Sequence, residues 1–432
     1  MLLMGGGGRE HALAVKLRQS PRLGDFYTTH AENPGLAALC TPVEVPVNIR
    51  EAYRLQQFIA KKDVGLVVIG PEDPLAEGFA DKLASEQTLV FGPTREAAQL
   101  ESDKSFAKQI MRAASVPTAE ARTFTDPEAA LNYVRSREHA PVVKAAGLAK
   151  GKGVVVPATV EEAAAAVERM MVAREFGDAG RKVVIEERLE GVEVSVLALV
   201  DGKNILVLPP CQDHKRLKDG DTGPNTGGMG AFCPTDSIGP AAMAQIEREI
   251  LVPTVDAMRR EGIEFRGVLY AGLMLTHAGP RVLEFNTRFG DPECQPLMAR
   301  LRCDLMELLL ATCLGRLDAV DVDWDPRPAV CVVLASDGYP EKPKMGVAIH
   351  GLERAAAVPG AQVLHSGTKR LPSGEIVTAG GRVLSVTALG DTMAEARDVA
   401  YRACEEIVFV GKTFRSDIAR GSRSEVMNTG AE

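Results

Sequence analysis

The sequence lacks the features that mark several large classes of protein. It has no excess of basic residues, because 50 Lys and Arg stand against 58 Asp and Glu, and this argues against a nucleic-acid-binding face. Its eight cysteines include no Cys-x-x-Cys pair, so neither a zinc site nor a disulfide framework is indicated and the cytoplasm is the expected compartment. No apolar run is long enough to cross a bilayer, and the first residues do not resemble a signal sequence. We therefore expect a cytoplasmic protein that binds neither nucleic acid nor a membrane.

The first hundred residues alternate short apolar runs with amphipathic stretches. This order predicts a parallel sheet covered by helices, with ligands at the carboxyl ends of the strands. The expected strands are residues 2–4, 26–29, 64–70 and 88–92, and the expected helices are residues 11–19, 51–61 and 74–86. A long helix capped by Thr94 is expected to run towards Ser115 and to bridge into the next domain.

The rest of the chain reads as three further units, in keeping with 432 residues of which 45% are hydrophobic. A small α+β unit is expected from helices 127–137 and 160–175 and strands 142–146, 154–157 and 182–189. A β-rich unit is expected from hairpins 192–208 and 268–286 with helices 240–260 and 294–314. After a linker at 321–328, a C-terminal domain is expected from strands 329–335, 362–364 and 382–387 and helix 393–408, with a frayed polar end.

Four consecutive glycines, Gly5 to Gly8, lie between the first expected strand and the first expected helix. Bare amides at a helix N-terminus can cradle an anion, so the turn is a candidate site for a substrate phosphate or sugar. A tight turn that merely needs glycine is the alternative. A dinucleotide-binding motif would need a further glycine and an acidic residue that are not at the expected places, which counts against a nicotinamide-dependent dehydrogenase.

A second glycine-rich segment, residues 144–154, lies between two expected strands. It is not a P-loop, because Gly153 follows Lys152 where that motif requires Ser or Thr. A hairpin lid that covers ATP phosphates, with Lys144 reaching them from a strand, fits the pattern. A solvated loop of Lys and Gly is the alternative.

Two charged segments are candidates for the remainder of a nucleotide site. Residues 184–193 form a hinge whose backbone and carboxylates could bind adenine and ribose, although they could equally be surface charges. In residues 284–293, Glu284 and Asn286 point to one face of an expected strand, and Arg288 continues that face. Such oxygens suit Mg²⁺, and the arginine could stabilise a transferring phosphoryl group, whereas an exposed polar strand face is the alternative.

Residues 212–216 and 221–230 form a long, polar, glycine-rich stretch in which we expect no secondary structure. Long loops inside compact domains are usually functional or disordered. His214 lies here, but no Ser/His/Asp or Cys/His combination gives it an acid-base role.

Taken in order, these segments resemble the phosphoribosylamine-glycine ligase family. The motifs are G-G-R-E-H at 7–11, G-P-E-x-P-L at 70–75, F-G-P-T at 91–94, Q-D-H-K-R at 212–216, D-T-G-P-N-T-G-G-M-G at 221–230, L-Y-A-G-L-M at 269–274, E-F-N-x-R-F-G-D-P-E at 284–293, H-S-G-T-K at 365–369 and G-G-R-V-L at 380–384. They span nearly the whole chain, and the D-T-G-P-N-T-G-G-M-G run is highly specific.

The resemblance implies an ATP-grasp architecture and a set of site residues. The implied fold has an N-terminal parallel α/β domain (1–103), an ATP-grasp core of two α+β units (104–190 and 191–324) and a small C-terminal α+β domain (325–432). The implied ATP-binding residues are Lys104, Lys144, Gly151, Gly153, Glu186, Glu187, Leu189 and Glu193, and the implied ligands of Mg²⁺, or alternatively Mn²⁺, are Glu284 and Asn286. The implied substrate-binding residues are Gly7, Gly8, Arg9, Glu72, Asp213, Lys215, Thr226, Gly227, Gly228, Met229, Arg288 and Asp291, and the implied catalytic residues are Arg288, Asp213 and Lys144.

Four points qualify these expectations, and the first is that the opening strand is short, which leaves the true start of the chain in question. Ala146 stands where the family usually has Asp, so any lid contact of that carboxylate is absent, and Asp337 fills a variable position in A-S-x-G-Y-P. The strand 269–274 offers no acidic metal ligand, which leaves the source of further ligands open.

The resemblance implies that the chain ligates glycine to 5-phosphoribosylamine in purine biosynthesis, by way of glycyl phosphate and at the expense of ATP. A ligase for another carboxylate or amine is the nearest alternative. A non-catalytic nucleotide-binding subunit is a second one, disfavoured by the presence of Glu284, Asn286 and Arg288. We expect a monomer.

Overall fold

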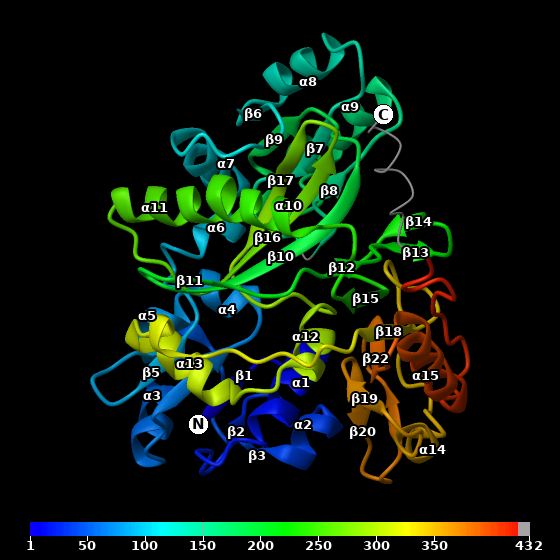
Figure 1. The fold of residues 1–432 in the computed structure, drawn as a ribbon. Helices are drawn as coiled ribbons and strands as arrows, with labels where there is room; N and C mark the ends of the chain where they lie inside the picture. Colours follow the sequence, from blue (N-terminus) through cyan, green and yellow to red (C-terminus); the bar gives the residue numbers. More distant parts are fainter. Residues whose placement is uncertain (150, 422–432) are drawn as a thin grey trace.

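The computed structural model describes residues 1–149 and 151–421, which form an N-terminal unit, a central unit and a C-terminal unit (Figure 1). Lys150 and the polar end, residues 422–432, lie outside the described residues, so the expectation of a frayed end is not addressed. Across 1–149 and 151–421, no helix is both long and apolar enough to span a membrane.

The N-terminal unit is a parallel five-stranded sheet, as the alternation of the first hundred residues predicts. Its strand order is β3-β2-β1-β4-β5. The strands are β1 (Leu2–Met4), β2 (Tyr27–Thr28), β3 (Thr41–Pro42), β4 (Leu66–Ile69) and β5 (Leu89–Phe91), and the helices are α1 (Gly8–Leu17), α2 (Pro34–Leu39), α3 (Ala52–Lys61), α4 (Glu72–Glu77) and α5 (Phe79–Leu83). Strands β1 and β4 are apolar throughout because both of their faces are covered.

Three details of this unit differ from the sequence prediction, and the first is strand β3, which was not expected. Helix α2 was not expected, although Asn33 caps it and Pro34 begins it, which is a favourable helix start. The single helix expected at 74–86 is divided by Gly78, whose φ of 91° is left-handed and ends α4.

The long bridging helix expected from Thr94 to Ser115 is wrong, because the structure has two helices there. These are α6 (Gln99–Ser102) and α7 (Lys104–Ala113). Asp103 adopts an extended conformation between them, and its side chain caps α7 by accepting the Ser105 and Phe106 N–H groups. A polar residue that caps the next helix interrupts the previous one.

The central unit contains two antiparallel sheets, one above the other in Figure 1. The smaller sheet has the order β6-β9-β7-β8, and its strands are β6 (Ala121–Phe124), β7 (Val142–Ala145), β8 (Val154–Val155) and β9 (Val183–Glu186). It packs on α8 (Pro127–Arg135) and α9 (Val160–Val167) through an Ala- and Val-rich core. Strand β6 was not expected from the sequence.

The larger sheet of the central unit has the order β11-β10-β16-β17, and both of its predicted hairpins are present. Its strands are β10 (Val192–Asp201), β11 (Ile205–Val207), β16 (Arg266–Thr276) and β17 (Gly279–Asn286). Helices α10 (Pro240–Ile246) and α11 (Val252–Arg260), joined by a π-helical turn, cover one face, in line with the helix expected at 240–260.

The C-terminal unit is a five-stranded antiparallel sheet with the order β12-β15-β18-β22-β19. Its strands are β12 (Gln212–Asp213), β15 (Gly230–Cys233), β18 (Ala329–Ala335), β19 (Ala361–His365) and β22 (Arg382–Leu389), with hairpins β13 (Arg216–Lys218)/β14 (Thr222–Asn225) and β20 (Thr368–Arg370)/β21 (Ile376–Thr378) and helices α14 (Leu352–Ala356) and α15 (Met393–Glu406). The expectation that 212–230 lacks secondary structure is therefore wrong. Strands β13 and β14 pair with each other, and β12 pairs with β15, which begins at Gly230 and joins a sheet whose other members come about a hundred residues later. No local pattern reveals that pairing.

Helix α12 (Cys294–Arg300) lies where the units meet. It contacts α1 of the N-terminal unit and β15, β18 and β22 of the C-terminal sheet. The single helix expected at 294–314 ends here, because Asp304 caps a separate helix, α13 (Leu305–Leu314). Residues at the start of α12 are thereby placed beside both terminal units.

Candidate active site

Lys144 on β7 reaches across from the smaller sheet to the larger one. Its ammonium pairs with one oxygen of Glu186 at the end of β9 and donates to the Leu283 carbonyl of β17 at 3.0 Å. The other Glu186 oxygen lies 2.6 Å from Lys108 Nζ. Glu186 was expected near adenine or ribose, whereas in this structure it is a buried counter-ion of two lysines.

Lys108 was missed by the sequence analysis, but its spacing could have revealed it. It lies four residues after Lys104 on α7, so both side chains are on one face of that helix. Burial lowers the pKa of Lys104, and the nearby charge of Glu284 opposes the shift. With Lys144, these residues concentrate positive charge between the two sheets.

The glycine-rich lid segment is tied to the start of α7. The Lys104 N–H donates to the Ala146 carbonyl at 2.8 Å, and the Ala146 N–H donates to the Lys182 carbonyl at 2.9 Å. Ala146 is buried, so the departure from the family Asp leaves the backbone contacts of this position in place. Gly151 has a φ of 75°, and Gly153 accepts from the Ala145 N–H through its carbonyl, which closes the base of the loop.

The hinge residues are more exposed than the lysine cluster. Glu187 accepts from the Glu120 N–H and pairs with Arg281, both at 3.1 Å. Leu189 is half-buried, and Glu193 is exposed and pairs with Lys215 at 3.2 Å.

Glu284 and Asn286 lie at the end of β17, on one face as their spacing predicts. They oppose Gly272 and Tyr270 of β16. Burial raises the pKa of Glu284, but nearby lysines, Lys215 first, hold it below its ordinary value. The carboxylate is therefore charged, and the pair offers two oxygens beside the cationic cluster.

Arg288 is clamped between two carboxylates of the N-terminal unit. Its guanidinium lies 3.0 Å from Glu101 Oε1 and 3.3 Å from Glu72 Oε2. Burial lowers the pKa of Arg288, but the charges of Glu101 and Glu72 outweigh this effect and raise the pKa above its ordinary value. The guanidinium therefore stays charged. The second Glu101 oxygen accepts from the Thr287 N–H at 2.7 Å. Glu72 is one of the residues expected at the site from the sequence, whereas Glu101 lies outside every recognised motif and was not expected.

Asp213 faces a buried polar network that the sequence analysis also missed. Tyr270 donates to Glu293 Oε1 at 2.5 Å, and the Ser195 hydroxyl lies 2.8 Å from the Tyr270 oxygen. Burial raises the pKa of Asp213 to about 8 against the opposing charge of Lys215. Burial therefore disfavours the ionised form of Asp213.

The glycine turn at 5–8 is bound by the chain's own carboxylates. The Gly7 N–H donates to Glu10 at 2.6 Å, and the Arg9 N–H donates to Asp291 at 3.5 Å. The Arg9 guanidinium donates to the Phe289 carbonyl at 2.9 Å, and a Cβ at Gly8 would lie 2.6 Å from Ser366 Oγ. The turn is thus in contact with the Asp291 loop and with Ser366, and its role in substrate binding stays a prediction.

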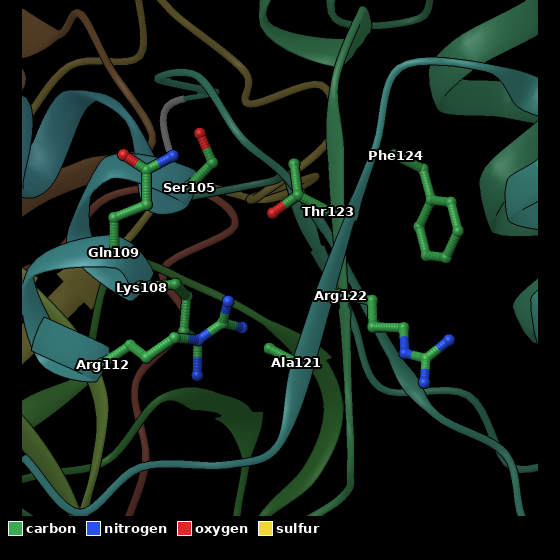
Figure 2. Close-up of a pocket in the computed structure, with 8 residues that line it drawn as sticks. All are labelled: Ser105, Lys108, Gln109, Arg112, Ala121, Arg122, Thr123 and Phe124. Carbon is green, nitrogen blue, oxygen red and sulfur yellow. The ribbon is translucent and has the colours of Figure 1, made fainter. Parts of the chain in front are cut away.

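The structure thus brings most of the candidate residues into one region between the sheets and the terminal units. Among residues 1–149 and 151–421, no group of three or more His, Cys, Asp or Glu side chains forms a metal-binding cluster. A cavity of about 450 Å³ lies beside this region, between α7 and β6 (Figure 2). Gln109 and Arg112 of α7 face Ala121 and Thr123 of β6 there, and none of the candidate residues from the sequence lines it.

Comparison with known proteins identifies the family of the chain. Residues 1–101, 102–294 and 329–421 match the models of the N domain, the ATP-grasp (A) domain and the C domain of phosphoribosylglycinamide synthetase. The chain is 49% identical over 426 residues to the phosphoribosylamine-glycine ligase of Rhodopirellula baltica, covering 97% of each chain.

Solved structures show the same fold. The crystal structure of phosphoribosylamine-glycine ligase from Thermotoga maritima superposes with a TM-score of 0.81 at 32% identity, covering 96% of this chain and 99% of that one. A biotin carboxylase domain of 2-oxoglutarate carboxylase from Hydrogenobacter thermophilus, solved with MgADP, superposes with a TM-score of 0.72 at 16% identity, covering 95% and 91%, and shares the fold alone. The chain therefore belongs to the phosphoribosylamine-glycine ligase family, the ATP-grasp ligases of purine biosynthesis.

Proposed function

We propose that the chain joins glycine to 5-phosphoribosylamine, with ATP as the source of energy, and that glycyl phosphate is the intermediate. The observation that carries the proposal is the convergence of Lys104, Lys144 and Glu284 between the two antiparallel sheets, with the charge of Arg288 close to Glu284. A cationic cluster beside paired oxygen donors suits phosphoryl transfer, in which positioning and charge stabilisation do most of the work.

The lysines would bind the phosphates of ATP. Lys104 and Lys144 come from α7 and β7, so the nucleotide would lie between the two sheets, under the loop that contains Gly151 and Gly153. Glu186, now a counter-ion of Lys144 and Lys108, would share these cations with the phosphates. Glu187, Leu189 and Glu193 follow β9 at the hinge, where adenine and ribose would be bound.

The donor set at the end of β17 fits Mg²⁺. Glu284 is ionised, and Asn286 adds an amide oxygen on the same face. Mg²⁺ prefers oxygen ligands and keeps several waters or phosphate oxygens, so two protein ligands are sufficient, and Mn²⁺ could replace it. The metal would neutralise charge on the nucleotide phosphates.

Arg288 would stabilise the phosphoryl group in transfer, since Glu72 and Glu101 hold its guanidinium in place. Asp213, Lys215, Asp291 and residues 226–229 would bind the two substrates on the other side. The amide-forming step releases a proton from the amine, and displacement of phosphate breaks the bond between the acyl carbon and the oxygen that glycine contributed. Gly7, Gly8 and Arg9 would contribute by placing the N-terminal unit against Asp291.

An isotope experiment tests the intermediate. Glycine with ¹⁸O in its carboxylate must leave one labelled oxygen in the released phosphate if that carboxylate attacks the γ-phosphate. Adenylation would instead put the label in AMP, and hydrolysis by water would label neither product. Mass spectrometry of the phosphate from a single turnover separates the cases, and unlabelled phosphate formed in step with amide would overturn the proposal.

Substrate choice needs a separate test. Phosphate release should require ATP, glycine and freshly made phosphoribosylamine together, and another carboxylate or amine that supports it better would favour a different ligase. We further propose that the protein works as a cytoplasmic monomer with its domains divided at 103, 190 and 324. Its eight unpaired cysteines are consistent with a reducing compartment.

A further inference from the structure

Gly227 is held on both sides of its peptide by side chains of the C-terminal unit. Its N–H donates to the Tyr339 hydroxyl at 2.9 Å, and its carbonyl accepts from Arg382 at 2.8 Å. Gly227 belongs to the D-T-G-P-N-T-G-G-M-G run, whereas Tyr339 and Arg382 lie more than a hundred residues later. Both polar groups of one backbone unit are thus fixed by a different part of the chain.

Arg382 makes a second set of contacts, with Asp291. It donates to the Asp291 carbonyl at 2.5 Å, and its guanidinium lies 3.5 Å from Asp291 Oδ2. A single guanidinium therefore links the glycine-rich run to the loop that follows Arg288. A planar group with five donors can satisfy several acceptors at fixed angles, which an ammonium cannot do.

The residues around the Arg382–Gly227 contact are so closely packed that a side chain in place of the neighbouring glycines would clash. A Cβ at Gly227 would lie 3.1 Å from Arg382 Cζ, and Gly228, with a φ of 109°, would bring a Cβ to 2.5 Å from Pro292 Cδ. Gly381 is equally close to the ring of Tyr339, so that ring lies against the backbone next to Arg382. Glycines at these positions let the C-terminal unit approach the run directly.

Residues 226–229 are in turn hydrogen-bonded to the segment that contains Asp213 and Lys215. The Thr226 hydroxyl donates to the Lys215 carbonyl at 2.9 Å, and the Met229 N–H donates to the His214 carbonyl at 2.8 Å. Residues 226–229 therefore lie between the C-terminal side chains and the β12 strand end, in hydrogen-bond contact with both.

We propose that Arg382 and Tyr339 are positioning residues of the ligase reaction, which fix residues 226–229 and, through them, Asp213 and Lys215 against the bound substrates. The inference rests on the proposed function, because it assigns the substrate side of the site to these elements. It also predicts that the two kinds of ligand are affected differently. Loss of either side chain should alter the use of glycine and phosphoribosylamine, whereas ATP binding, which depends on the lysine cluster of the other units, should stay unchanged.

Steady-state kinetics of Arg382→Met and Tyr339→Phe test the division. Removal of a hydrogen bond to a charged donor should lower kcat/KM for phosphoribosylamine by about tenfold or more in Arg382→Met, and loss of the neutral phenol by roughly two- to fivefold in Tyr339→Phe. Arg382→Lys, which keeps the charge but not the fork, should fall between wild type and Arg382→Met. The KM for ATP should stay within about twofold of wild type throughout.

A matched control removes an exposed arginine of the same unit whose side chain contacts the carboxylate and the carbonyl of Glu406 rather than residues 226–229. Arg354, which pairs with Glu406 at 2.8 Å, serves this purpose, and Arg354→Met should leave all three KM values unchanged. Thermal melts show which variants are folded, and Tyr339→Phe decides the question if Arg382→Met does not fold.

Two results would overturn the proposal: unchanged kinetics for both substrates in folded Arg382→Met or Tyr339→Phe, or a parallel rise in the KM for ATP. Inactive wild-type protein, in contrast, would count against the proposed function itself.

Discussion

Glu101 offers a sharp test of how the site holds Arg288. The side chain is buried, with one oxygen 3.0 Å from the Arg288 guanidinium and the other accepting the Thr287 N–H at 2.7 Å. Glu101→Gln keeps the shape but can satisfy only one of these neighbours. If its amide oxygen stays with Thr287, its NH₂ group faces the guanidinium.

The loss should be confined largely to activity. A hydrogen bond to a charged group contributes about 1.5–3 kcal/mol, so a misplaced Arg288 should lower kcat/KM by roughly 10- to 150-fold. Burial raises the pKa of Glu101 despite the attraction of Arg288, so ionised Glu101 carries a cost that Gln avoids. We therefore expect Tm to fall by less than about 4 °C.

The assay is phosphate release with glycine and phosphoribosylamine, alongside a thermal melt. Glu96→Gln is the matched control, because Glu96 is an exposed carboxylate five residues earlier. The reasoning is refuted if Glu101→Gln keeps kcat/KM within twofold of wild type, or if its activity falls only in proportion to its stability.

Three further outcomes are expected. Glu284→Gln should raise the Mg²⁺ concentration needed for activity with little change in Tm. Glu264→Gln, at an exposed position, is the control and should change neither quantity. An unshifted Mg²⁺ titration in Glu284→Gln would contradict the assignment of Glu284 as a metal ligand. The pKa of Asp213 in the folded protein is raised to about 8, whereas in the unfolded chain it is about 3.9. The protonated carboxyl therefore stabilises the fold fully below about pH 3.9, and this stabilisation is lost as the pH rises through about 8. Melts from roughly pH 5 to pH 9 should therefore show a smaller decline for Asp213→Asn than for wild type, and parallel curves would argue against burial of this carboxyl. Lys152 is exposed in the lid loop, so MgATP should slow tryptic cleavage after it, and equal rates with and without nucleotide would count against a closing lid.

Local patterns predicted the elements whose partners are close in sequence. The apolar runs of β1 and β4 identified the parallel sheet, and the turns at Gly202 and Gly279 identified the two hairpins of the larger sheet. The spacing of Glu284 and Asn286 placed both on one face of β17. Each of these inferences depends on geometry that repeats within a few residues.

Features that depend on distant partners could not be predicted in this way. Residues 212–230 have no strand pattern, yet β12 lies in the C-terminal sheet, because it pairs with β15, which in turn pairs with the distant β18. Glu101 and Ser195 carry no motif, and their roles follow only from Arg288 and Tyr270, which the fold brings beside them. The expected long helix is interrupted at Asp103 because the side chain of Asp103 accepts backbone N–H groups at the start of α7. Helix periodicity alone does not show that a side chain will cap a new helix instead of continuing the previous one.

The strands of the C-terminal sheet come from two distant parts of the sequence, and this affects how the chain folds during its synthesis. Strand β15 bonds to β18 along its whole length, yet about a hundred residues separate the two in the order of translation. While the ribosome adds that stretch, the edge of β15 that later pairs with β18 stays open, and unpaired edges invite contacts between chains. We expect nascent chains that end before residue 329 to be captured by chaperones or to aggregate, and chains extended past β22, which then complete the sheet, to escape both.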